Sequence, residues 1–94
     1  MPAYSVAVMN VSDQEKYQEY AKLAGPAVAK YGGKFLFRAG KPALMEGKFD
    51  YSRMAVVEFP DVESAKKYYH SPEYQAAKAK RLGAADFNLI IFEG

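Results

Sequence analysis

The sequence has no cysteine, no tryptophan and a single histidine, His70, among its 94 residues. The absence of cysteine excludes disulfides, thiolate metal ligands and thiol nucleophiles. One histidine without any cysteine argues against a zinc site, so we expect neither a metal nor a cofactor. A chain free of cysteine suits a reducing compartment, and we expect a cytoplasmic protein.

Long hydrophobic runs and a strong net charge are also missing. No stretch approaches the roughly 20 apolar residues of a membrane-spanning helix, and residues 1–4 lack the basic start of a secretion signal. The formal net charge is only +2, with acidic residues interleaved among the lysines, so little affinity for phosphate backbones is expected. We therefore predict no membrane partner and no nucleic-acid partner.

What the sequence does contain is a regular succession of hydrophobic patterns. Apolar alternation predicts strands at residues 4–11, 34–39, 54–59 and 87–92, and helical spacing predicts helical regions after the first and third of them. The length suits one domain covering residues 1–94. The order strand, helix, strand, strand, helix, strand is the split βαββαβ arrangement of ferredoxin-like domains. The expected fold class is α+β, with a four-stranded antiparallel sheet and the helices on one face.

Local signals set the boundaries of the helices. Ser12 and Glu15 have the spacing of a capping box at the start of the first helix, and Gly25-Pro26 predicts a kink there or two short helices in line. In the second helical region, Asp61 and Ser71 are the predicted N-caps of two successive helices.

The second strand has the least regular surroundings. Simple alternation places Phe35 and Phe37 on one face, with Leu36 and Arg38 on the other. Residues 43–46 are a candidate extension of this strand past a bulge, within a stretch long enough to be functional.

The first, third and last strands have apolar residues on both faces, as at Val56 and Val57 or Ile90 and Ile91. Two helical regions cover only one face of a four-stranded sheet, and the other face of an antiparallel sheet usually meets water. We therefore predict a homodimer in which a second copy covers that face. The buried interface should reach about 1,600 Å² in total.

Six short stretches distributed over nearly the whole chain are informative together: Tyr31-Gly32-Gly33-Lys34-Phe35, Glu46-Gly47, Glu58-Phe59-Pro60, Ser71-Pro72-Glu73-Tyr74, Arg81 and Glu93-Gly94. In these the chain resembles the bacterial proteins grouped as domain of unknown function 1330, within the dimeric α/β-barrel superfamily. The resemblance implies a ferredoxin-like subunit that pairs through its sheet into a barrel, and it implies no settled activity. Relatives in the wider superfamily include cofactor-free monooxygenases, lactone isomerases and haem-degrading enzymes. The sequence has no motif of these enzymes, so none of their catalytic residues is carried over.

Two residues are candidates for catalysis. His70 is the only side chain that titrates near neutral pH without perturbation, so it is a candidate general base or ligand donor. The alternative is that it ends a helix and interacts with the last carbonyl groups. Glu58 shares a strand face with apolar residues, and burial there would raise its pKa toward the range of a general acid. The alternative for Glu58 is an ion pair with an arginine.

Five further residues are candidates for ligand binding. Arginine side chains bind anionic groups through bidentate contacts, and an aspartate in the long loop or a tyrosine after Pro72 can line a pocket. For the charged residues the alternative is solvation at the surface, and for the tyrosine it is packing. The candidates are Arg38, Asp50, Arg53, Tyr74 and Arg81.

These observations predict a homodimeric domain that holds a small organic molecule between sheet and helices. It is a candidate cofactor-free enzyme, isomerase- or monooxygenase-like, that uses acid–base chemistry. The first alternative is a non-catalytic homodimeric binding or interaction module. RNA binding is a weaker alternative, because residues 32–37 resemble an RNA-binding strand motif but lie on the second strand instead of the third.

Overall fold

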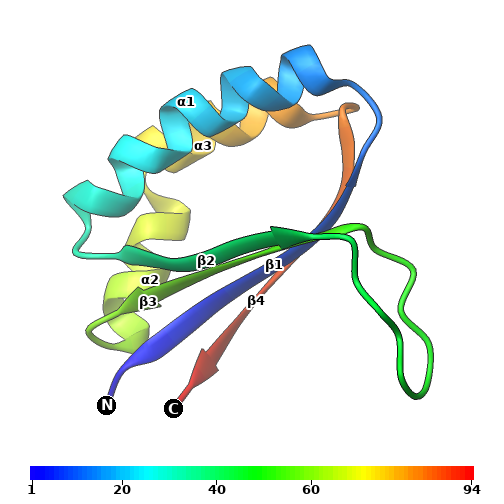
Figure 1. Ribbon diagram of the computed structural model, residues 1–94. Helices are drawn as coiled ribbons and strands as arrows, with labels where there is room; N and C mark the ends of the chain where they lie inside the picture. The colour runs from blue at the N-terminus through cyan, green and yellow to red at the C-terminus, as the bar shows by residue number, and fades with distance from the viewer.

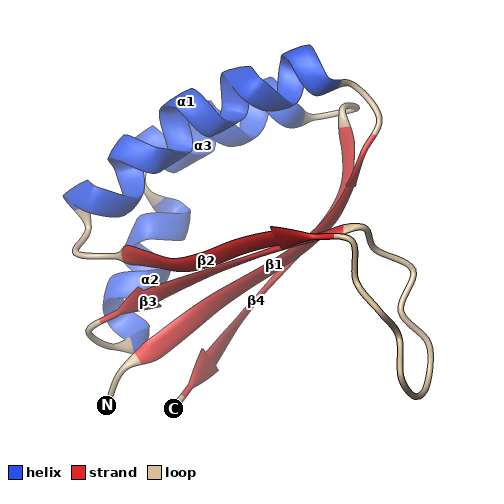
Figure 2. Cartoon of the chain, in the orientation of Figure 1, coloured by secondary structure: helices blue, strands red, loops and turns tan.

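A four-stranded antiparallel sheet with the spatial order β2-β3-β1-β4 runs through the computed structural model, which describes residues 1–94 (Figure 1). The strands are β1 (Ala3–Val11), β2 (Lys34–Gly40), β3 (Arg53–Phe59) and β4 (Ala85–Glu93). The helices are α1 (Gln14–Lys30), α2 (Val62–His70) and α3 (Pro72–Arg81), and they pack on one face of the sheet (Figure 2). The predicted ferredoxin-like α+β fold is therefore confirmed.

The start of α1 differs from the prediction. Its N-cap is Asp13, whose side chain accepts a hydrogen bond from the Lys16 amide at 3.2 Å. The predicted capping box at Ser12 is wrong, because the Ser12 hydroxyl instead donates to the carbonyl of Ala84 at 3.0 Å. This contact ties the entry of α1 to the turn before β4.

The predicted division of α1 into two helices is also wrong. The helix continues through Pro26 to Lys30, with proline inside it. Proline removes one backbone hydrogen bond, to the carbonyl of Lys22. That loss is tolerated because Ala27 and Val28, directly after it, are almost fully buried in the core.

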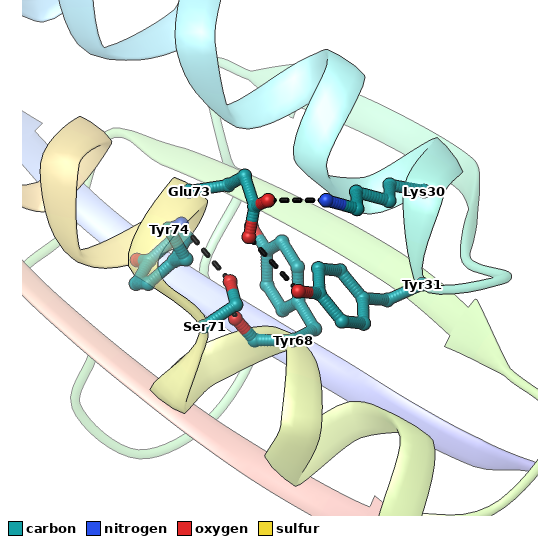
Figure 3. Close-up of polar contacts among 6 residues, drawn as sticks. All are labelled: Lys30, Tyr31, Tyr68, Ser71, Glu73 and Tyr74. Atoms are coloured by element: carbon teal, nitrogen blue, oxygen red, sulfur yellow. Dashed lines mark hydrogen bonds and ion pairs between the residues drawn. The ribbon is translucent and has the colours of Figure 1, made fainter.

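The predicted caps of the other two helices are confirmed. Asp61 accepts a hydrogen bond from the Ser64 amide at 2.7 Å and so begins α2. The Ser71 hydroxyl accepts from the Tyr74 amide at 3.0 Å and donates to the carbonyl of Tyr68 at 2.7 Å (Figure 3). One serine therefore ends α2 and begins α3, which sets the angle between them.

A β-bulge changes the faces of β2. Phe35 pairs with Val57, whereas Phe37 pairs with Val56, so Leu36 is the extra residue. An extra residue shifts the alternation by one position. Phe35 therefore faces the helices and Phe37 faces away, and the prediction that they share a face is wrong.

Beyond the bulge, β2 ends at Gly40, and residues 41–52 form a projecting loop (Figure 1). The predicted extension of the strand over residues 43–46 is therefore also wrong. The base of the loop is held to β1, because the Asn10 side chain donates to the carbonyl of Asp50 and accepts from the Ser52 amide.

The core lies between the helices and the helix-facing side of the sheet. Its largest fully buried side chains are Tyr74 and Phe59. The opposite side, here called the open face, carries no helix. Its apolar side chains include Val6, Val8, Phe37, Val56, Ile90 and Phe92. None of the three helices has the length and hydrophobicity that crossing a bilayer requires.

Candidate functional site

A cavity of about 90 Å³, here called the inner cavity, lies between α1 and the sheet. It exists because small side chains face one another across this layer, where larger ones would fill the space. The small residues of its walls are Ser5, Ala7 and Ala55 from the sheet and Ala21, Ala24 and Gly25 from α1. The larger walls are mostly aromatic, and they include Tyr17, Tyr20, Phe35, Tyr68 and Phe87.

A second hollow of about 260 Å³, the outer cavity, adjoins the inner one. The two share Met9, Tyr17, Arg38 and Ala55 in their walls. The outer cavity adds Arg53, which stands at the start of β3. An apolar interior thus opens into a mouth that carries two guanidinium groups.

The bulge in β2 positions Arg38 at this mouth. After the bulge Arg38 pairs with Ala55, which faces the helices. The Arg38 guanidinium carbon lies 4.2 Å from the centroid of the Phe35 ring. Stacking of this kind holds an exposed arginine in place at little cost in hydrogen bonds.

Tyr17 is the ionisable side chain of α1 in both cavities. Burial raises the pKa of Tyr17, and three nearby arginines, led by Arg53, offset only part of that rise. Its hydroxyl therefore stays protonated and can donate a hydrogen bond. The walls of both cavities contain no carboxylate and no imidazole, so they offer no side-chain base that is active near neutral pH.

A polar network lies beneath the aromatic wall. Arg81 is only 7% exposed, and its Nη2 donates to the Tyr74 hydroxyl at 3.2 Å. The hydroxyl oxygens of Tyr74 and Tyr20 lie 3.1 Å apart. Burial disfavours the charged form of Arg81, but the hydrogen bond to Tyr74 and the nearby Tyr20 outweigh that effect and raise the pKa of Arg81.

A second network joins the end of α1 to the start of α3. The Glu73 carboxylate accepts from the Lys30 ammonium and, at 2.9 Å, from the Tyr31 hydroxyl (Figure 3). The hydrogen bond from Lys30, together with that from Tyr31, lowers the pKa of Glu73 to about 2. These contacts fix α1 over the inner cavity.

The two candidate catalytic residues are not brought together. His70 ends α2, is exposed, and its ring meets the Tyr69 ring edge-on, with centroids 5.2 Å apart. Glu58 lies on the open face and forms an ion pair with Lys34 at 3.6 Å instead of with an arginine. Neither lines the inner or the outer cavity, and their catalytic roles stay predictions.

The candidate ligand-binding residues are dispersed. Arg38 and Arg53 both line the outer cavity. Tyr74 is fully buried and Arg81 nearly so, and both lie behind the cavity wall. Asp50 is exposed in the projecting loop and lines neither cavity.

The sequence predicted a ligand between sheet and helices but did not identify Tyr17 or the small residues that line the inner cavity. The signal was present as small residues at facing positions, namely Ala21, Ala24 and Gly25 in one segment and Ser5, Ala7 and Ala55 in two others. It becomes visible only when the register of the sheet is known, because these segments lie far apart in the sequence.

Comparisons with known proteins place this geometry in context. The model of the family described as "Domain of unknown function (DUF1330)" matches residues 2–94. A search of curated proteins gave no match.

Three solved structures illustrate the likeness. RPA0582 from Rhodopseudomonas palustris, a protein of unknown function, aligns with a TM-score of 0.80 at 20% identity, over 99% of this chain and 82% of that one. A dimeric ferredoxin-like protein of unknown function from Jannaschia sp. CCS1 aligns with a TM-score of 0.79 at 12% identity, over 100% of both chains. SnoaB, a cofactor-independent oxygenase from Streptomyces nogalater, aligns with a TM-score of 0.70 at 13% identity, over 99% of this chain and 92% of that one. At these identities the likeness concerns the fold.

Proposed function

This chain belongs to the family of domain of unknown function 1330, and we propose that it binds a small organic acid in the inner cavity. The observation that carries the proposal is the juxtaposition of an apolar cavity with Arg38 and Arg53 at its mouth. Sites for small molecules are mostly apolar hollows with a few convergent polar groups.

Size and charge define the ligand further. An apolar cavity of about 150 Å³ binds benzene in an engineered protein. The inner cavity, at about 90 Å³, therefore suits a short aliphatic group or part of a ring whose remainder lies in the adjoining outer cavity of about 260 Å³. The two arginines favour a carboxylate or a similar anion. The Tyr17 hydroxyl, held protonated by burial, supplies a further donor.

Binding is the function that this geometry supports best, whether or not turnover follows. A cofactor-free isomerase or monooxygenase-like reaction is the second candidate, since SnoaB shares the fold. Because no carboxylate or imidazole lines the cavities, such a reaction would start from a ligand that is already an anion. Tyr17 and the arginines would then hold the ligand and stabilise its charge.

Benzoate and its neutral analogue benzamide test the binding proposal. We expect benzoate to raise the melting temperature of the wild-type protein and benzamide to raise it less. Ala24→Leu fills the inner cavity and Arg38→Gln removes a cation from its mouth. Arg38→Gln should weaken benzoate binding by about tenfold, the usual effect of losing a charged hydrogen-bond partner. Ala24→Leu should weaken it because the larger side chain takes up the space that the ligand needs.

The matched control is Lys22→Gln, because Lys22 is an exposed cation of α1 that lines neither cavity. It should leave benzoate binding unchanged. Equal affinity in the wild type, Ala24→Leu and Arg38→Gln would contradict the proposal.

The proposal also includes pairing of two chains through the open face. Three large apolar side chains there are about half exposed: Phe37 at 49%, Ile90 at 55% and Phe92 at 52%. A contiguous apolar patch of this kind marks an interface. The Jannaschia protein, which shares the fold over its whole length, is dimeric. Sedimentation at micromolar concentration should therefore give twice the mass of one chain.

A further inference from the structure

A third cavity, here called the α3 cavity, lies between the helices and β4 and has a volume of about 290 Å³. Its walls are Tyr69, Lys78, Arg81, Phe87, Leu89 and Ile91. Lys78 and Arg81 are three residues apart in α3, so their side chains point to the same side of the helix. Phe87, Leu89 and Ile91 are alternate residues of β4 on the helix-facing side of the sheet.

The charge in this cavity is unbalanced. Arg81 is only 7% exposed, and its Nε is a buried donor with no acceptor. Lys78 donates to the Tyr69 hydroxyl at 3.0 Å, which is a neutral partner. No acidic residue lines the cavity, and the ion pairs of the chain involve neither Lys78 nor Arg81. Two cations therefore share one cavity without a carboxylate.

Buried cations are normally paired with an anion, because removing an unpaired charge from water is expensive. Two contacts hold the Arg81 side chain in the interior. Its guanidinium carbon lies 3.7 Å from the centroid of the Phe87 ring, and its Nη2 donates a hydrogen bond to the Tyr74 hydroxyl. Neither contact neutralises the charge or satisfies Nε. An anion in the cavity, beside the Arg81 guanidinium and the Lys78 ammonium, would neutralise this charge.

We propose that the α3 cavity is a second binding site, which takes a small carboxylate with a flat apolar body. The carboxylate would lie beside the Arg81 guanidinium and the Lys78 ammonium, and the body would lie against Phe87, Leu89 and Ile91. A free phosphate fits less well, because three of the walls are hydrocarbon and cannot replace its water shell. The volume is at the lower end of the range for ligand sites, which limits the ligand to a single ring or its equivalent.

This site is separate from the inner cavity. The two have only Phe87 and Leu89 in common, which stand between them as a wall. Lys78 lines only the α3 cavity, and Arg38 lines only the inner and outer ones. Substitutions at these two positions therefore report on the two sites independently.

Benzoate titration followed by nuclear magnetic resonance provides the test, with the assigned Arg81 Nε–H signal and the backbone amide of Tyr17 as reporters. We expect benzoate to shift both signals, each with its own saturation curve. Lys78→Met keeps the aliphatic stem and removes the charge, so it should weaken the Arg81 response by about tenfold and leave the Tyr17 response unchanged. Lys80→Met is the matched control, because Lys80 is an exposed cation of the same helix that does not line this cavity.

Four outcomes would overturn the proposal of a second site. One is an Arg81 signal that does not respond to benzoate, and another is an equal response in the Lys78→Met and Lys80→Met proteins. The third is inorganic phosphate binding as tightly as benzoate, which would show that the apolar walls contribute nothing. Loss of the Arg81 response in Arg38→Gln would also overturn it, because there would then be one site. An Arg81 response with no Tyr17 response would support the second site and contradict the proposed function of the inner cavity.

Discussion

The hydroxyl oxygens of Tyr20 in α1 and Tyr74 in α3 lie 3.1 Å apart in the interior. Arginine can only donate hydrogen bonds, so Tyr74 accepts from Arg81 and its own proton is free to bond to Tyr20. The two helices that cover the cavities are thus joined by one polar chain. A buried polar chain contributes rigidity only while every member keeps a partner.

Tyr74→Phe should lower the free energy of unfolding by about 1–3 kcal/mol, because it leaves the Arg81 and Tyr20 groups without a partner in the interior. Urea denaturation measures the change. Tyr31→Phe is the control, since the Tyr31 hydroxyl is only partly buried and its partner Glu73 retains Lys30. A Tyr74→Phe protein as stable as the wild type would show that the network does not stabilise the fold.

Buried tyrosines should also limit stability at high pH. Burial raises the pKa of both Tyr20 and Tyr68 well above the usual value. A group whose pKa is higher in the folded state contributes stability below its unfolded pKa, about 10 for tyrosine, and that contribution is lost above it. Stability should therefore decline above about pH 10. Absorbance of tyrosinate should show these two rings ionising only together with unfolding, and their earlier ionisation in the folded protein would refute the prediction.

Glu73 should produce a pH dependence at the acid end. Its pKa is lowered from 4.5 to about 2, so its contribution is fully present above pH 4.5 and is lost as the pH falls toward 2. Glu73→Gln should lower stability at neutral pH, and the difference from the wild type should shrink below pH 4.5. The matched control is Glu63→Gln, in the first turn of α2, where the carboxylate forms no ion pair. If the two substitutions lowered stability equally, the lost stability would come from removing a carboxylate near a helix N-terminus and not from the ion pair between Glu73 and Lys30.

The features that sequence alone predicted are those that depend on neighbouring residues. Asp61 and Ser71 cap helices through contacts three residues away, and the alternation in β1 and β4 follows from their own side chains. The cap at Ser12 failed because Ser12 and Asp13 are both good capping residues. The carbonyl of Ala84, far along the chain, engages the Ser12 hydroxyl and leaves the cap to Asp13.

The features that sequence alone missed depend on pairing between distant segments. The bulge at Leu36 places Arg38 at the mouth of the cavities, and it is set by the register of β2 on β3. A strict alternation would have put Arg38 on the open face. The site was thus only partly predictable. The sequence identified Arg38 as a candidate for ligand binding, but the face on which it lies depends on the register of β2 on β3.

The open face provides the last prediction, which concerns self-association. Ile90 lies on this face in β4, is 55% exposed, and pairs with Val6 of the central strand β1. If two chains pair through the face, Ile90→Glu would place an unpaired carboxylate inside the interface, which is strongly unfavourable. We expect this protein to sediment as a folded monomer where the wild type sediments as a dimer, with the fold checked by circular dichroism.

The control is Leu23→Glu, because Leu23 is a comparably exposed apolar residue, at 42%, but lies on α1 away from the open face. That protein should remain a dimer. Dissociation by Leu23→Glu and not by Ile90→Glu would place the interface on the helices, and a dimer in both would show that the open face is not where the chains meet. A wild-type monomer at micromolar concentration would mean that half-exposed Phe37, Ile90 and Phe92 remain in water without a second copy.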